Sequence, residues 1–239
     1  MKKVILILIF FTSSVVTGII FQGSYTNYNF DESDALYTLI VSNVIHDGDE
    51  IDLDNVRAKH FRGKTNADVK ALLVNGTLMT QLPSNLAGFF PNLKALTVNK
   101  TELFVIADED IEFFHDLEFI QVINNNLTTL DGNLFRFTPK IKFIDFSNNQ
   151  LDHIGDELFA HLTEISVVDF QNNNCIDSVA TYDEIMEKLI GSIIQQCQLV
   201  PSTSEDDVRD VAEADAQREM GRVKPDEFSG ECTIRCSVS

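Results

Sequence analysis

The hydrophobic residues of this chain recur with a period of 24 residues. The residue that starts each unit is apolar in all five copies, with no insertion or deletion between them: Leu72, Leu96, Ile120, Ile144 and Val168. A second apolar residue follows two positions later, as Val74, Val98, Val122, Phe146 and Phe170. Because alternate residues of a strand point to the same face, each pair predicts a short strand with one buried side.

The rest of each unit repeats in the same register. Five positions after the start come Thr77, Thr101, Asn125, Asn149 and Asn173. We expect these polar side chains to satisfy backbone groups where the chain turns. Apolar residues further along each unit, among them Phe89, Phe113, Phe137 and less well His161, are predicted to pack the convex side. One unit cannot bury its apolar face alone, so the pattern predicts stacked repeats.

This pattern, LxxLxLxxNxL, resembles that of the extracellular leucine-rich-repeat family with 24-residue repeats, from Val69 to about Cys197. The stretch from His60 to Val69, together with Leu82-Pro83 and Phe90-Pro91-Asn92-Leu93, is similar to small secreted members from flies and mosquitoes. The resemblance implies an α/β solenoid, a horseshoe with short parallel strands on its concave face, an N-terminal cap and a helical C-terminal cap. Some insect relatives act in innate immunity as soluble recognition proteins, which implies a role of that kind here.

The first residues predict secretion. Lys2 and Lys3 precede the apolar run Val4–Phe11, and Val16 and Gly18 fit the two specificity positions of a cleavage site. We therefore interpret residues 1–18 as a signal peptide, which makes the protein secreted and extracellular. The alternative is a membrane anchor over Val4–Phe21. No other apolar run is long enough to span a membrane.

The expected domains follow the repeats. Residues 19–68 form the N-terminal cap, with strand-like stretches at 37–41 and 51–53, and residues 69–174 hold about five repeats. Related proteins often close the N-terminal cap with a Cys pair, which is missing here, so this cap must hold by packing alone. Residues 175–200 form the C-terminal cap, with an amphipathic helix over 182–196, and residues 201–239 form an acidic, largely disordered tail. The apolar face of that helix is expected to consist of Ile185, Met186, Leu189, Ile190, Ile193 and Ile194.

The four cysteines read as disulfide partners, because the chain is interpreted as secreted. A Cys175–Cys197 bond would hold the helix over the exposed end of the core. Cys232 and Cys236 are spaced for neither a zinc ribbon nor a redox motif. Local pairing, pairing between two chains and a mixture stay open, so a homo-oligomer is one alternative.

Charge and chemistry favour binding over catalysis. The formal charge of −19, from 37 acidic and 18 basic residues, disfavours nucleic acid as a partner. None of the five histidines converges with a Ser or Cys nucleophile in the expected fold, and the acidic run from Asp47 to Asp54 lacks the Gly and Glu of a calcium loop. We predict no catalytic residue, no metal and no cofactor. Asn75, Asn99 and Asn126 each begin a glycosylation sequon.

Residues between the consensus positions should point outward on the concave face. The first such column consists of Ala71, Ala95, Phe119, Phe143 and Val167. With Ile123, its last three members predict an apolar contact surface, beside which Gln121, Asp145 and Asp169 favour a partner carrying Lys or Arg at its rim. Glycans on Asn75 and Asn99 would crowd the other half of the face. The acidic tail or a second copy of the chain could cover the rings instead.

We therefore predict a secreted protein that recognises a protein ligand through its concave face. The alternative function is a structural or adhesive component of the extracellular matrix. Oligomers linked through Cys232 and Cys236 would favour that alternative.

Overall fold

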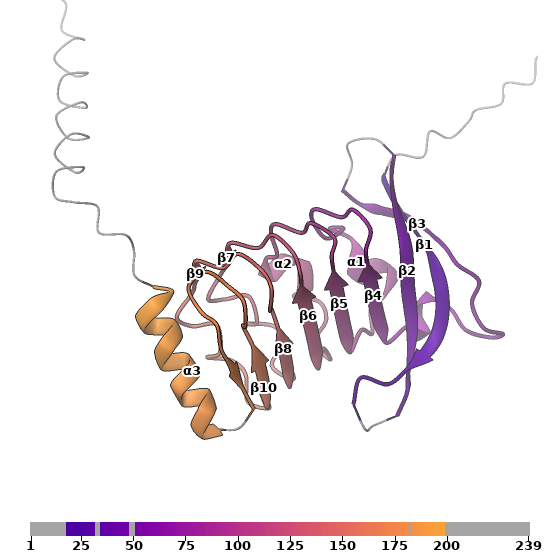
Figure 1. Cartoon of the computed structure of the whole chain (residues 1–239). Helices are drawn as coiled ribbons and strands as arrows, with labels where there is room; N and C mark the ends of the chain where they lie inside the picture. The colour runs from indigo at the N-terminus through magenta and orange to yellow at the C-terminus, as the bar shows by residue number, and fades with distance from the viewer. Residues whose placement is uncertain (1–17, 32–33, 48–50, 182, 199–239) are drawn as a thin grey trace, which may run out of the picture. The chain divides into compact units, whose positions relative to one another are not determined.

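A nine-stranded sheet organises the computed structural model, which describes residues 18–31, 34–47, 51–181 and 183–198 (Figure 1). The strand order is β11-β10-β8-β6-β5-β4-β2-β1-β3, and the pairs from β2 to β10 are parallel. The proposed signal peptide (apart from Gly18), the acidic tail, Cys232 and Cys236 lie outside the described residues.

The repeats supply five parallel strands whose register follows the 24-residue period. They are β4 (Ala71–Asn75), β5 (Ala95–Asn99), β6 (Phe119–Ile123), β8 (Phe143–Asp145) and β10 (Val167–Asp169). Leu72 pairs with Leu96, Leu96 with Ile120, and so on to Val168. These consensus residues are fully buried, as are the apolar residues two positions later. The fold is therefore the predicted leucine-rich-repeat solenoid.

The asparagine of each later repeat connects neighbouring turns, as the pattern predicts. The Asn125 side chain donates to the Val98 carbonyl at 2.9 Å and accepts from the Leu103 amide at 3.2 Å. Asn149 and Asn173 repeat this arrangement one and two units further on. Since these backbone groups lie in the interior, leaving one of them unsatisfied would cost about 1–3 kcal/mol.

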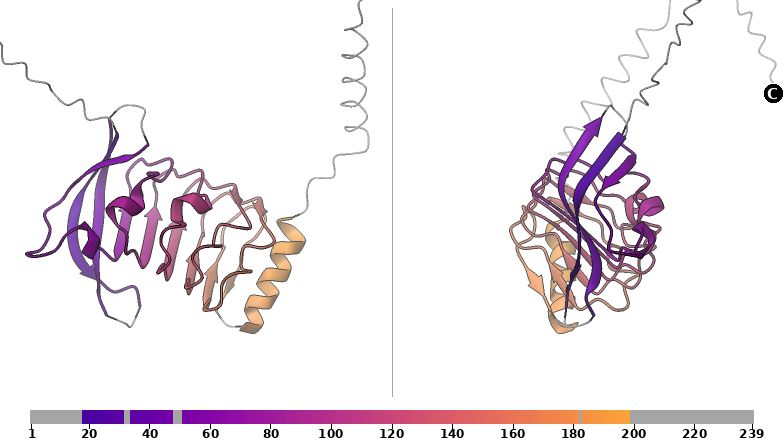
Figure 2. Two further views of the ribbon diagram at one scale, coloured as in Figure 1. Left: turned by 180° about the vertical axis from the view of Figure 1, so that it is seen from behind. Right: turned by 90° about the vertical axis from the view of Figure 1, so that its right-hand side faces the viewer.

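The convex side is built from α1 (Leu86–Phe89), α2 (Asp108–Ile111), β7 (Thr129–Leu130) and β9 (His153–Ile154), and it faces the viewer in the left view of Figure 2. The prediction that Phe113 and Phe137 pack there is wrong, because they are 63% and 38% exposed. The buried ring is one position later, as in Phe90 and Phe114. Leu86 and Phe90 lie four residues apart on one helical turn and both face the core, whereas Phe89 is only half-buried at its edge.

The N-terminal cap is a long antiparallel hairpin of β1 (Gly18–Tyr28) and β2 (Leu36–Asp47), with β3 (Leu53–Arg57) on its outer side. Ile51 is exposed and precedes the strand that was expected to include it. Strand β1 had not been predicted, although Ile19, Ile20 and Phe21 at its start are buried. A short 3-10 helix, η1 (Asn66–Asp68), then leads into the first repeat.

A cluster of aromatic and polar side chains closes this cap in place of a disulfide. The rings of Tyr25 and His60 stack with centroids 4.0 Å apart, and the Tyr25 hydroxyl donates to Oδ1 of Asn66 at 3.0 Å. His60 Nε2 lies 2.9 Å from the same Asn66 oxygen, and His60 Nδ1 lies 3.1 Å from the Tyr37 hydroxyl. The two tyrosines come from β1 and β2, so the cluster ties the hairpin to the loop that enters the repeats.

The C-terminal cap is β11 (Val179–Ala180) followed by α3 (Asp183–Gln196). Leu189 and Ile193 of the helix are buried as expected, whereas Ile194 is 50% exposed because it faces away from the repeats. The predicted disulfide joins Cys175 to Cys197, with their Cα atoms 5.1 Å apart. The bond connects the end of the last repeat to the end of the helix.

Candidate functional site: the concave face of the sheet

A row of apolar side chains crosses the concave face at the first positions of β6, β8 and β10, the strands in front in Figure 1. Phe119, Phe143 and Val167 pair in register there, and each is half-buried. The rings of Phe119 and Phe143 have centroids 6.4 Å apart. Ile123, at the other end of β6, is also half-buried. The four predicted apolar residues therefore lie on one face, and three of them are direct neighbours.

Phe30, from the loop after β1, extends this row and was not foreseen from the sequence. Its ring lies 5.8 Å from that of Phe119 and 5.0 Å from that of Tyr28. Since β4 and β5 separate β2 from β6 in the sheet, the end of the hairpin must cross both strands to make this contact. The row on the concave face thus runs from Phe30 through Phe119 and Phe143 to Val167.

The first two members of the same column differ from expectation. Ala71 and Ala95 are fully buried rather than exposed on the concave face. They occupy the positions between Thr38 of β2 and Phe119 of β6, at the same ends of the strands where Phe30 meets Phe119. The next columns over β4 and β5 are not covered, because Leu73 and Thr97 are half-buried and Asn75 is exposed. The N-terminal half of the face is therefore closed at its first column alone.

Two carboxylates stand beside the open part of the row. Asp145 and Asp169 are register partners on β8 and β10, and each accepts a hydrogen bond from the backbone amide two residues later. Burial raises the pKa of Asp169, and the nearby carboxylates of Asp145 and Asp177 raise it further. Neither Asp145 nor Asp169 forms an ion pair with a Lys or Arg among the described residues. A cation from outside the chain would relieve this repulsion.

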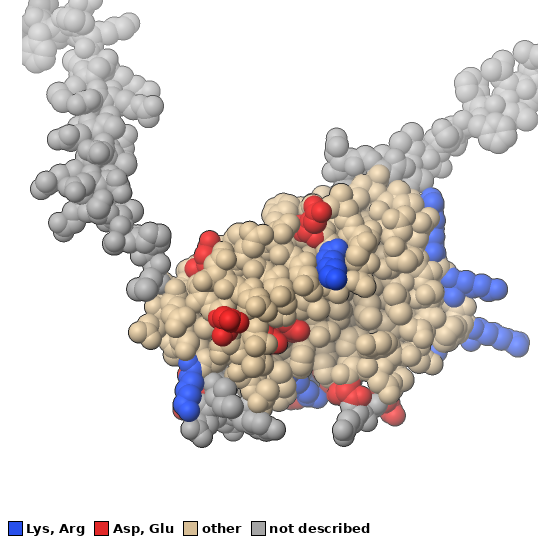
Figure 3. All heavy atoms as spheres, in the orientation of Figure 1, with Lys and Arg blue, Asp and Glu red and all other residues tan. Residues whose placement is uncertain are grey.

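Gln121 lies one strand away from these carboxylates. Its Oε1 accepts a hydrogen bond from the Thr97 hydroxyl at 3.0 Å, which fixes the amide on the face. In Figure 3, the surface over β4 to β10 is mostly uncharged, with small groups of acidic side chains and a basic one. The side chains of Lys94 and Lys142, which lie just before β5 and β8, are engaged with Glu118 at 2.7 Å and 2.9 Å. The face offers apolar, amide and carboxylate groups to a ligand.

The three sequon asparagines differ in how free they are. Asn75 is exposed, and its side chain makes no hydrogen bond to the described residues. Asn99 is half-buried and accepts from the Asn124 side chain at 2.9 Å, and Asn126 accepts from Gln150 at 3.2 Å. Asn75 and Asn99 are register partners at the ends of β4 and β5, so any glycan there would lie at the N-terminal half of the face.

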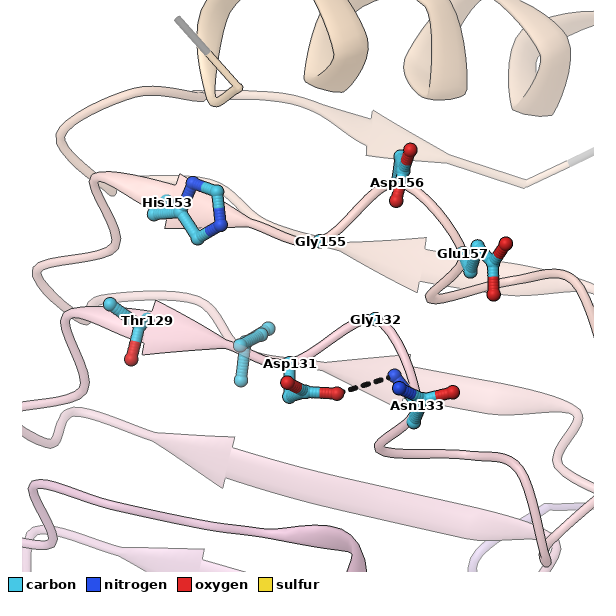
Figure 4. A pocket seen from close by; sticks show the side chains of 9 residues that line it. Thr129, Asp131, Gly132, Asn133, His153, Gly155, Asp156 and Glu157 are labelled. Carbon is cyan, nitrogen blue, oxygen red and sulfur yellow. Dashed lines mark hydrogen bonds between the residues drawn. The ribbon is translucent and has the colours of Figure 1, made fainter. Parts of the chain in front are cut away.

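A hollow of about 480 Å³ lies beside β7 and β9 (Figure 4). It is shaped by the backbones of Gly132 and Gly155, which approach so closely that a Cβ on Gly155 would stand 2.3 Å from the Gly132 nitrogen. Asp131, Asp156 and Glu157 lie at its rim without converging (Figure 4). Among the described residues, no group of three or more His, Cys, Asp or Glu side chains is placed to hold a metal ion.

No family model and no curated protein matches the chain. Among solved structures, the chain is similar to TLR13 in a complex with ssRNA13, at 21% identity and a TM-score of 0.44, over 51% of this chain and 18% of that one. It is also similar to a chain of the Toll–Spatzle complex, a hub in Drosophila development and innate immunity, at 18% identity and a TM-score of 0.42, over 51% and 17%. This chain therefore spans less than a fifth of the length of either structure.

Proposed function

We propose that this protein is a secreted recognition protein that binds a protein ligand through the C-terminal half of its concave face. The observation that carries the proposal is the aromatic row at Phe30, Phe119 and Phe143, which continues to Val167 on a mostly uncharged face. Rings grouped on a rigid sheet lose little conformational entropy on binding, and such groups supply most of the affinity in protein interfaces. Innate immunity is the setting that the sequence resemblance favours.

The carboxylates beside the row indicate that the ligand carries positive charge at its rim. Asp145 and Asp169 stand beside the row without an ion pair to the described residues, and the pKa of Asp169 is raised by its burial and its acidic neighbours. A ligand with an apolar centre and Lys or Arg at its rim would bury its centre against the rings and pair its rim with these carboxylates. Nucleic acid does not fit a face whose charged groups include unpaired carboxylates, since its phosphates would be repelled.

The start of the folded cap supports secretion. Gly18 begins β1, and Ile19, Ile20 and Phe21 are buried within the cap. Residues 18–21 therefore belong to the folded sheet, and cleavage next to Gly18 would keep the buried residues 19–21 in the mature protein. A Cys175–Cys197 disulfide is also a bond that persists in an oxidising compartment. In the part of the chain that the structure describes, no helix is long and apolar enough to cross a membrane.

The test compares two surfaces of the same protein. A double variant, Phe119→Ser with Phe143→Ser, removes two rings of the row, whereas the control Phe113→Ser removes an exposed ring from the convex side. Proteins retained from the extracellular fluid by the unchanged protein would be identified and their affinities measured with purified components. We expect the double variant to lose about 100-fold or more in affinity and the control to lose less than about twofold.

Secretion yield and melting temperature keep this test interpretable, because both variants should be exported and folded. A ligand that binds the double variant as well as it binds the unchanged protein would contradict the proposal. Loss of binding in Phe113→Ser alone would place the interface on the convex side and contradict it equally.

A further inference from the structure

A group of basic side chains stands at the N-terminal end of the solenoid, in a chain that is acidic elsewhere. Arg57, Lys59, Arg62 and Lys64 lie within eight residues, and no Asp or Glu occurs between Asp54 and Asp68. All four are exposed. In Figure 3, basic side chains project from the end of the molecule formed by the N-terminal cap. Lys64 pairs with Asp68 at 3.3 Å, whereas Arg57, Lys59 and Arg62 have no ion pair among the described residues.

Three cations of the repeats are paired within the chain. Lys94 and Lys142 both bind Glu118, and Lys140 binds Asp116. Each of these pairs joins residues 24 positions apart, which is one repeat. Arg57, Lys59 and Arg62 differ from these three because they lie close together in the sequence and lack such carboxylate partners among the described residues, so their charges repel one another.

Protection of a sheet edge does not explain them. β3 is the last strand of the sheet, and exposed edges often carry Lys to prevent pairing with another chain. Here the edge is already blocked, because the Asn85 side chain accepts from the Leu53 amide at 2.7 Å and donates to the Leu53 carbonyl at 3.0 Å. The Val56 amide is likewise capped by the Asn55 side chain at 2.7 Å. The basic group is therefore available for another role.

A hollow lined by apolar residues and by polar ones such as His60 and Asn66 adjoins the basic group. It has a volume of about 590 Å³ and lies between the loop after β3 and the segment after α1, with Lys64, Ala67, Phe89 and Pro91 among its lining residues. Phe61, next to Arg62 in the chain, is 46% exposed. A ligand with negative charge alone would contact the cations and leave the hollow empty. Because Phe89 and Pro91 line the hollow, it can also receive an apolar side chain.

We infer that this end of the protein is a second docking surface, which binds an acidic peptide segment of a partner protein. The segment's carboxylates would pair with Arg57, Lys59 and Arg62, and one of its apolar side chains would enter the hollow beside Phe89. The charge complementarity and the hollow are separate observations that fit the same ligand. This surface lies on the cap, away from the rings of β6 and β8, so it is independent of the concave face.

The test uses two synthetic fluorescent peptides, one alternating Asp with Leu and one with every Leu replaced by Ser, and fluorescence anisotropy on the secreted protein. We expect the Asp-Leu peptide to bind at least about tenfold more tightly than the Asp-Ser peptide, and to weaken as salt is added. Arg62→Glu should weaken binding about tenfold or more, because it reverses an unpaired charge of the surface. The matched control Lys100→Glu, an exposed cation at the end of β5, should change it less than about twofold.

Several results would overturn the inference. Equal binding of the two peptides, or equal loss in Arg62→Glu and Lys100→Glu, would reduce the surface to a general polyanion attraction. Displacement of both peptides by heparin with no preference for Leu would do the same. Self-association that Arg62→Glu abolishes would make a second copy the occupant. Phe119→Ser with Phe143→Ser should leave peptide binding intact, which separates this inference from the proposed function.

Discussion

The two halves of the sheet share one register but differ in what lies over the first residue of each strand. In the N-terminal half that residue is Ala71 or Ala95, and it is fully buried. In the C-terminal half it is Phe119, Phe143 or Val167, and it is half-buried on an open face. The comparison teaches that one repeated position can be closed by small side chains in one half of the sheet and present large apolar side chains in the other.

The ends of the two halves differ as well. The N-terminal end holds through the hydrogen bonds and stacked rings of Tyr25, Tyr37, His60 and Asn66, whereas the C-terminal end is joined covalently at Cys175–Cys197.

The largest expected effect on stability comes from removing the covalent bond of the C-terminal end. Replacing both cysteines by Ser should lower the free energy of unfolding by about 3 kcal/mol, because the unfolded chain regains the freedom of the closed loop. Urea denaturation under non-reducing conditions measures this loss.

A substitution in the aromatic cluster of the N-terminal end serves as the control for the loss of the disulfide. Removing the Tyr25 hydroxyl with Tyr25→Phe breaks one hydrogen bond and should cost about 1 kcal/mol. If the Ser variant is as stable as the unchanged protein, the disulfide does not hold the C-terminal cap and the contrast between the two ends fails.

A substitution at the column itself should be next in size. Ala95→Phe places a large ring where the hairpin end crosses, and should destabilise the protein by about 1–3 kcal/mol through overpacking. Val167→Phe puts the same ring on the open half and should change stability by less than about 0.5 kcal/mol. Thermal unfolding of the two variants measures the difference. Equal effects would show that the hairpin does not confine Ala95.

The smallest expected effect concerns the ion pairs just outside the strands. Burial raises the pKa of Glu118, but the ammonium groups of Lys142 and Lys94 lower it by more, so its pKa lies below the ordinary value of 4.5. A depressed carboxyl pKa contributes stability above the unfolded-state pKa, and that stability is lost as the pH falls through the folded-state pKa. Glu118→Gln should therefore cost up to about 1 kcal/mol at neutral pH and progressively less in acid. Urea titrations at several pH values check this, and a pH-independent loss would contradict it.

The sequence predicts the repeated part of the fold well, because a fixed period determines both the strand faces and the register. Asn125 illustrates this, since its position in the pattern already implies the bonds to backbone that it makes. Phe89 and Phe90 are adjacent in the sequence, so the pattern does not show which ring is buried. The helical turn of α1 places Phe90 in the core.

Contacts between unrelated segments could not be predicted in the same way. Phe30 lies outside the repeats and meets Phe119 only because the hairpin end crosses two strands. The repeat pattern alone places Asp169 on the concave face, whereas the burial that raises its pKa depends on the packed structure.

The most direct test of the central claim is a photo-crosslinking measurement. A benzophenone amino acid would replace Gln121, which neighbours Phe119 on β6 and pairs in register with Asp145, or Phe113 on the convex side, in otherwise unchanged secreted protein with its purified ligand. The account predicts a crosslink from position 121 that Phe119→Ser with Phe143→Ser removes, and none from position 113. A bound ligand that crosslinks from position 113 and not from position 121 would contradict it.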